Sequence, residues 1–164
     1  MPTRATPASD DNDAPLGVDE KFSNLVAQGD LAGLMAFPDL RARIAAGDDE
    51  GWTPLHWAAL YGHAECAGFL LAHGAEVDAV SAAGETPLMI AAESRRKNAL
   101  AVLLDAGADT ARTRQSGENT LDILRAQGAS DLLAFVRETT AARHSVAQQA
   151  VALLSPLAVR KRAP

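Results

Sequence analysis

The chain has 164 residues, of which 48% are hydrophobic and 22% charged, so its length and composition suit one globular domain with its own core. Its net charge of −6 argues against general affinity for nucleic-acid phosphates and favours cationic partners. The single cysteine, Cys66, excludes an internal disulfide, and no zinc-ligand spacing is present. No stretch approaches the roughly 20 apolar residues of a membrane span. We therefore expect a cytoplasmic protein that binds neither nucleic acid nor membrane.

The first segment, residues 1–16, is rich in Pro, Asp, Ser and Ala. It lacks the apolar core of a secretory signal, and its composition cannot bury enough apolar surface to offset the entropy of ordering. We expect it to be disordered.

A sequence motif then recurs at a fixed interval. The residues Gly-Trp-Thr-Pro-Leu-His-Trp-Ala-Ala at 51–59 return as Gly-Glu-Thr-Pro-Leu-Met-Ile-Ala-Ala at 84–92, which is 33 residues later. A fainter copy, Gly-Glu-Asn-Thr-Leu-Asp-Ile, begins at Gly117 after a further 33 residues. This pattern resembles the ankyrin repeat, which has the same period and a Thr-Pro-Leu-His core. The resemblance implies an all-α solenoid of helix-turn-helix units with loop tips between them.

The period divides residues 17–140 into four repeats, at about 17–49, 50–82, 83–115 and 116–140. The first repeat is degenerate, because it lacks the Thr-Pro-Leu-His core and carries Pro38 near the end of its second helix. Departures of this kind are typical of a capping repeat, whose outer face meets water.

The second repeat has the clearest helix signals. Thr53 suits an N-cap and Pro54 the first helical position, where its missing N–H costs nothing. Gly62 is expected to end the first helix, and residues 65–72 to form the second. In the third repeat Arg95 replaces that glycine, which is unfavourable for the short turn between helices. In the fourth, Asn119 and Asp122 predict a capped helix, followed by a second one from near Ser130.

The C-terminal part contains no Gly or Pro between Asp131 and Ser155, so the last helix either continues or breaks near Thr139. We expect a C-terminal helix at 141–157 and a solvated basic tail at 158–164. An apolar stripe follows helical spacing in this helix: Val146, Ala150, Leu153, Leu154 and Leu157. It is expected to cover the flank of the fourth repeat, with partner binding or self-association as the alternatives.

The ankyrin resemblance implies a concave binding face built from the loop tips and the first helix of each repeat. The family's surface positions fall on these candidate partner-binding residues: Asp49, Glu50, Trp52, Leu60, Tyr61, Glu85, Glu93, Ser94 and Glu118. Trp52, Leu60 and Tyr61 are expected to be apolar anchors, because aromatic side chains dominate interface energetics. Trp57 is expected to be mainly core.

The acidic members of this set predict a rim that complements a partner with a basic or mixed apolar and basic surface. The alternative is a solvated rim that maintains solubility. Either arrangement is consistent with a monomer, with self-association through 141–157 left open.

An enzymatic site is not indicated. The sequence has no Gly-rich phosphate loop and no nucleophile elbow, and Cys66 falls at a position that the repeat buries. We expect no catalysis, cofactor or metal. The sequence therefore predicts a protein–protein interaction module, or alternatively a dedicated inhibitor or immunity-type regulator of a cognate enzyme.

Overall fold

The structure, a computed structural model, describes residues 20–154, and the side chains of residues 21–150 among them. The expected disordered segment 1–16 and the basic tail 158–164 lie outside the described residues. The helices are α1 (Glu20–Gln28), α2 (Leu31–Met35), α3 (Leu40–Ala45), α4 (Pro54–Tyr61), α5 (Ala64–Ala72), α6 (Pro87–Glu93), α7 (Lys97–Asp105), α8 (Thr120–Ala126) and α9 (Ser130–Leu154).

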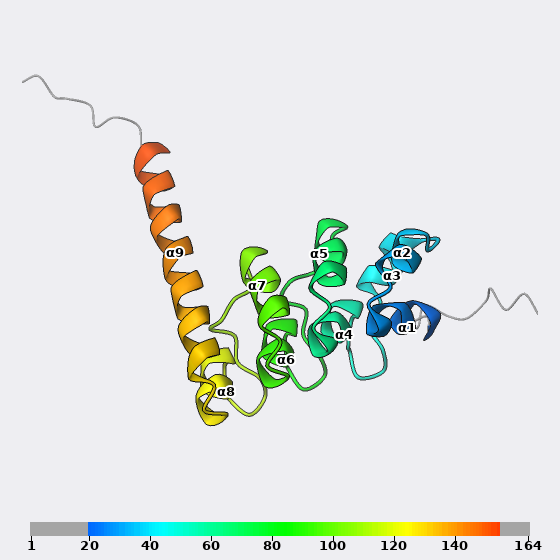
Figure 1. The fold of residues 1–164 in the computed structure, drawn as a ribbon, viewed down its shortest axis with the longest axis horizontal. Coiled ribbons are helices and arrows are strands. Elements are labelled where there is room, and N and C mark those ends of the chain that lie inside the picture. The colour runs from blue at the N-terminus through cyan, green and yellow to red at the C-terminus, as the bar shows by residue number, and fades with distance from the viewer. Residues whose placement is uncertain (1–19, 155–164) are drawn as a thin grey trace, which may run out of the picture.

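These helices form two rows that run the length of the molecule (Figure 1). One row is α1, α4, α6 and α8, in which each helix packs against the next. The other row is α2, α5, α7 and α9, with the same neighbour-to-neighbour packing. The described residues contain no strand, and their one isolated β-bridge joins Thr113 to Asn119. The expected all-α helix-turn-helix solenoid is confirmed.

Burial follows the sequence period. Leu55 and its counterpart Leu88 are buried in the first row, and Leu70 and Leu103 are buried in the second. Each helix pair thus contributes its apolar face to one continuous core that crosses the repeats.

The first helix of each later repeat begins as expected. Thr53, Thr86 and Asn119 are the N-caps of α4, α6 and α8, and a proline follows each threonine. The turn after α4 contains Gly62 with φ 81°, a left-handed conformation that glycine adopts without steric cost. The turn after α6 also contains a residue in the left-handed conformation, although that residue is Arg95, with φ 56°. The missing glycine therefore strains this turn without abolishing it.

The loop tips between repeats are joined by backbone hydrogen bonds. Ala82 N–H donates to the carbonyl of Glu50 at 2.8 Å, and Gln115 N–H donates to that of Ala83 at 3.1 Å. At Gly51, φ is 76° and an added Cβ would lie 3.2 Å from the nitrogen of Ala82. Glycine is needed there because the next tip approaches so closely.

Side chains also join the repeats where the first-row helices end. The carbonyl of Ala27 accepts a hydrogen bond from His63 Nε2 at 2.9 Å. The carbonyl of Leu60 accepts one from Arg96 Nε at 3.1 Å, again from the repeat that follows. The same kind of contact recurs at the carbonyl of Glu93, which is bound by Gln127 Nε2 at 3.0 Å. These donors satisfy carbonyls that a helix end leaves without partners.

For the first repeat, the sequence predicts a single helix after the first one, with Pro38 near its end. The structure has two short helices there, and Pro38 lies in the turn between α2 and α3. A proline lacks the N–H that a continuous helix requires, so the chain stops and restarts with Asp39 as the N-cap of α3.

The last helix is continuous, so the alternative break near Thr139 does not occur. The hydroxyls of Thr139 and Thr140 donate to carbonyls one turn earlier, which leaves the helix intact. Toward its C-terminal end α9 projects away from the stack (Figure 1). Val146 is 66% exposed, so the expected covering of the fourth repeat by this stripe is wrong for its described part. Leu157 and the side chains of Leu153 and Leu154 lie outside the described residues.

Candidate functional site

Three aromatic side chains form a line along α4, which we call the aromatic line: Trp52, Trp57 and Tyr61. The ring centroids of Trp52 and Trp57 lie 4.9 Å apart, and those of Trp57 and Tyr61 lie 6.3 Å apart in a stacked arrangement. Trp57 and Tyr61 are one helical turn apart, which places them on the same side of α4. Trp52 continues the line onto the loop tip before the helix.

The aromatic line follows the least buried side of α4. Tyr61 is 43% exposed, and Trp52, Trp57 and Leu60 are half-buried, whereas other residues of the helix are buried. Trp57 was expected to be mainly core, but it links the two predicted anchors. Its Nε1 is buried and has no hydrogen-bond partner. The result is a contiguous apolar surface at which a protein partner could replace water.

The loop tip at one end of the line carries exposed carboxylates. Asp49 and Glu50 are both exposed at this tip. The neighbouring Asp48 fixes the tip's shape, because its Oδ1 accepts hydrogen bonds from the N–H groups of Glu50 at 3.0 Å and Trp52 at 2.8 Å. Asp48 therefore fixes the backbone of the acidic tip together with that of Trp52, the first member of the aromatic line.

The other acidic candidates lie farther along the solenoid, around Arg114. Arg114 Nη1 lies 3.4 Å from Glu85 Oε1 and 2.5 Å from Glu93 Oε1, and Nη2 pairs with Glu118. Hydrogen bonds from Arg114 and then Ser116 hold the pKa of Glu118 below its usual value. The pKa of Arg114 is raised, chiefly by its hydrogen bond to Glu118. Part of the predicted rim is thus neutralised within the chain.

Sequence reasoning missed Arg114, although the repeat period contains a signal for it. Arg114 occupies the position of Asp48 and Ser81 in the preceding repeats. Ser81 Oγ accepts hydrogen bonds from the N–H groups of Ala83 and Glu85, as Asp48 does at its own tip. The tip-forming position just before the fourth repeat therefore carries a cation, which pairs with the nearby carboxylates.

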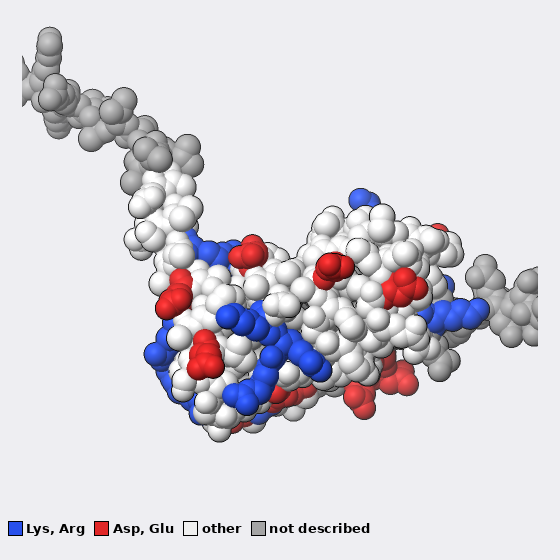
Figure 2. All heavy atoms as spheres, viewed as in Figure 1, with Lys and Arg blue, Asp and Glu red and all other residues white. Residues whose placement is uncertain are grey.

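A basic groove lies at the far end of the aromatic line. Its volume is about 240 Å³, and it is lined by Tyr61, Gly62, Arg95, Arg96, Lys97 and Asn98. Figure 2 shows Lys and Arg side chains gathered over α6, while Asp and Glu side chains lie below α4 at the lower edge. The aromatic line therefore runs from an acidic tip to a basic turn. The last candidate, Ser94, is the C-cap of α6 next to this turn.

The residues with acid–base or nucleophilic chemistry have structural surroundings. His56 is buried, with Nδ1 accepting from Thr53 N–H at 3.1 Å and Nε2 donating to the Glu85 carbonyl at 3.0 Å. Burial lowers the pKa of His56 and raises that of the Cys66 thiol, which is also buried. Neither group is a ready proton carrier or thiolate nucleophile in this state.

Among the described residues, no three His, Cys, Asp or Glu side chains converge as a metal site would require. No helix in that part of the chain combines the length and apolar character needed to cross a bilayer.

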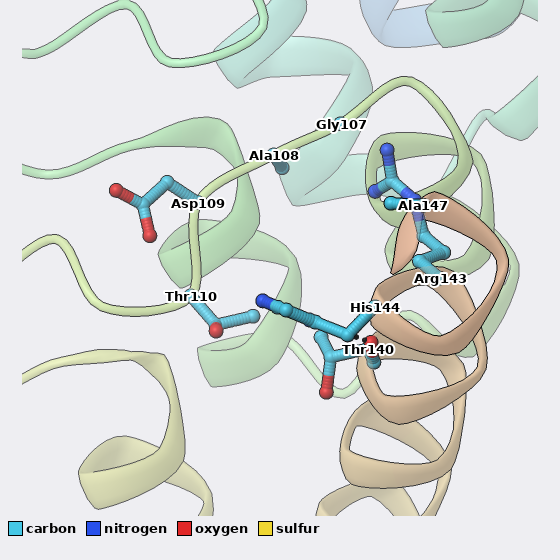
Figure 3. A pocket seen from close by; sticks show the side chains of 8 residues that line it. All are labelled: Gly107, Ala108, Asp109, Thr110, Thr140, Arg143, His144 and Ala147. Atoms are coloured by element: carbon cyan, nitrogen blue, oxygen red, sulfur yellow. Dashed lines mark hydrogen bonds between the residues drawn. The ribbon is translucent and has the colours of Figure 1, made fainter. Parts of the chain in front are cut away.

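A separate cleft of about 350 Å³ lies between α9 and the loop after α7. Figure 3 shows Arg143 and His144 extending from α9 toward the loop that holds Gly107 and Thr110. Arg143 donates a hydrogen bond to the carbonyl of Leu104, which fastens α9 to the end of α7. Beyond this attachment point the helix leaves the solenoid.

Comparison with known proteins identifies one family across most of the solenoid. A family described as ankyrin repeats in three copies matches residues 25–114. Protein phosphatase 1 regulatory subunit 27 of Homo sapiens is 32% identical over 107 residues, which are 65% of this chain and 70% of that protein.

Other relatives match over shorter stretches or small parts of longer proteins. Ankyrin repeat domain-containing protein 13C of Danio rerio is 53% identical over 45 residues, covering 27% of this chain and 9% of that protein. SH3 and multiple ankyrin repeat domains protein 2 of Homo sapiens is 27% identical over 96 residues, covering 58% and 5% respectively. This chain therefore spans only a small part of the length of these two longer proteins.

Proposed function

Because the chain belongs to the ankyrin-repeat family, we propose that it is a non-catalytic interaction module that binds one partner protein along the aromatic line. The observation that carries the proposal is the continuity of Trp52, Trp57 and Tyr61 on the least buried side of α4. Aromatic side chains supply large contact areas with few rotamers to immobilise, and they are enriched among interface hot spots.

The solenoid supports this role mechanically. The tips are joined by hydrogen bonds between Ala82 and Glu50 and between Gln115 and Ala83, and His56 bridges two repeats. A surface held in this way loses little conformational entropy when a partner docks. The proposed mechanism is therefore docking onto a preformed face.

Because Asp49 and Glu50 are exposed carboxylates, the partner is expected to present a cationic side chain at the loop tip. A Lys or Arg beside an apolar group would complement this end of the surface. Glu85, Glu93 and Glu118 contribute less to such attraction, because Arg114 already pairs with them. In this proposal the protein acts in the cytoplasm as a monomer, and its partner is neither nucleic acid nor membrane.

A second candidate function is regulation of an enzyme by binding it. It is favoured by the similarity to a protein named as a phosphatase regulatory subunit, of which this chain covers 70%. The same face would then hold or occlude an enzyme, as a dedicated inhibitor or immunity-type regulator does. An effect of the purified protein on the activity of a captured enzyme separates this function from scaffolding.

The test is affinity capture from the native host, comparing the intact protein with a folded Trp52→Ala/Tyr61→Ala variant. A Val80→Ala variant is the matched control, because Val80 is 52% exposed and lies in the loop after α5, outside the aromatic line. One partner captured by the intact protein and by the control, but lost in the double variant, supports the proposal. Equal capture by all three proteins would overturn it.

A further inference from the structure

The aromatic line ends at a groove whose charge is opposite to that of the loop tip. Arg95, Arg96 and Lys97 are exposed and consecutive at the turn between α6 and α7. Tyr61, the last member of the aromatic line, forms part of the same groove. The apolar surface and the basic turn are therefore contiguous.

The three cations have no acidic partners within the described part of the chain. Arg114 and Arg125 form ion pairs elsewhere on the surface, and the nearby carboxylate of Glu93 is bound to Arg114. Arg96 Nε donates to the Leu60 carbonyl, and Lys97 Nζ lies 5.2 Å from the centroid of the Phe135 ring. These contacts position the side chains and leave their charge uncompensated.

The turn is also held in place. The side chain of Arg96 packs across Gly62, where an added Cβ would lie 2.8 Å from its Cδ. Arg95 is kept in a left-handed conformation, with φ 56°, by a turn that links two packed helices. The basic groove is therefore formed by side chains that pack between two adjacent repeats.

On the basis of the proposed function, we infer that the partner is a protein segment with an acidic residue that enters the basic groove beside Tyr61. The groove volume of about 240 Å³ suits one side chain rather than a larger ligand. A carboxylate there would meet Arg95 and Lys97 while an apolar neighbour covers Tyr61. The opposite end of the same segment would present its basic residue to Asp49 and Glu50.

The positions of the acidic tip and the basic groove determine in which direction the bound segment runs and how far apart its charged residues lie. The eight residues of α4 span about 12 Å at 1.5 Å per residue. An extended segment covers that length with about four residues at 3.3 Å each. The surface thus selects segments with a basic and an acidic end on either side of an apolar centre, and it disfavours the reversed polarity, which would place like charges together.

The experiment is selection of a random peptide library on the intact protein, followed by affinity measurements of individual labelled peptides. The test variant is Arg95→Glu/Lys97→Glu, which retains Arg96 and its bond to the Leu60 carbonyl. The matched control is Arg41→Glu/Arg112→Glu, an equal charge change at two exposed arginines that do not line the groove. Circular dichroism and thermal unfolding confirm that all the variants are folded.

The inference predicts that selected peptides are enriched in Asp or Glu and bind the test variant about tenfold more weakly, with less than about a twofold change in the control. Absence of acidic enrichment, or equal binding to the test variant, would overturn it, as would the failure of any peptide to be enriched. If peptides lose binding to Trp52→Ala/Tyr61→Ala but retain it on the test variant, the proposed function stands and this inference fails.

Discussion

His56 joins two repeats through Glu85, because its Nε2 donates a 3.0 Å hydrogen bond to the Glu85 carbonyl 29 residues along the chain. Its Nδ1 accepts from the N–H of Thr53 within its own repeat. The ring therefore fixes the start of α4 and the tip of the next repeat together, and both features position the aromatic line.

The first prediction is that His56→Ala destabilises the fold by about 2 kcal/mol, because buried partners lose their hydrogen bonds. Urea unfolding followed by circular dichroism measures the effect. His73→Ala is the control, since His73 is exposed and bonds only within its own turn, to the Phe69 carbonyl. A loss no larger in His56→Ala than in His73→Ala would show that the bridge contributes little.

The same residue predicts a pH dependence. Burial lowers the pKa of His56 below its ordinary value of 6.5, so the unfolded chain binds a proton that the folded state resists. Its contribution to stability is present above pH 6.5 and is lost as the pH falls. Between about pH 7 and about pH 5 the intact protein should lose more stability than His56→Ala. Parallel curves for the two proteins would contradict this assignment.

The second prediction concerns the left-handed turn at Arg95. Arg95→Gly should stabilise the protein by about 1 kcal/mol, because glycine lacks the Cβ that makes φ 56° costly. Arg95→Ala keeps the Cβ and should not stabilise it, so the difference between the two variants isolates the backbone effect. Thermal unfolding measures both, and equal melting temperatures for them would count against strain at this turn.

The third prediction concerns the carboxylates around Arg114. In Arg114→Gln the pKa of Glu118 should rise toward its ordinary value, because the hydrogen bonds and charge that lower it are removed. Since the pKa is depressed in the folded state, this pairing stabilises the protein above the ordinary carboxylate range and the effect disappears in acid. Carboxyl titration by NMR measures the shift. In the control Arg125→Gln, which breaks only the pair with Asp122, the pKa of Glu118 should be unchanged.

The fourth prediction is that the protein is monomeric at micromolar concentration. The described part of the α9 stripe offers only the small groove of Ala142, Val146 and Ala150, which is far less apolar area than a stable dimer buries. Light scattering after size exclusion measures the mass of the intact protein and of Val146→Glu. A dimer that Val146→Glu dissociates would establish self-association through this helix instead.

The repeat period predicts the fold well because each signature residue acts locally. Thr53 and Pro54 start α4, and Asn119 with Asp122 starts α8, as their sequence context indicates. The left-handed turn at Arg95 could not be predicted in this way, since it is imposed by the packing of α6 against α7. At this turn the packing of the two helices outweighs the preference of a non-glycine residue for negative φ.

The surface was only partly predictable. The repeat positions of Trp52 and Tyr61 predict them as anchors, but their connection through Trp57 depends on side-chain exposure along α4. The pairing of Arg114 with Glu85 and Glu93 joins residues 29 and 21 positions apart. Such contacts follow from how adjacent repeats stack, which charge counting along the chain does not reveal.

The dissociation constant of the captured partner, measured by titration calorimetry, tests whether the aromatic line binds that partner. Trp52→Ala and Tyr61→Ala are each expected to weaken binding by about tenfold or more, as truncation of hot-spot residues does. Val80→Ala should leave the affinity unchanged. Affinities for Trp52→Ala and Tyr61→Ala within about twofold of the intact protein would show that the partner does not bind the aromatic line and would place the binding surface elsewhere on the solenoid.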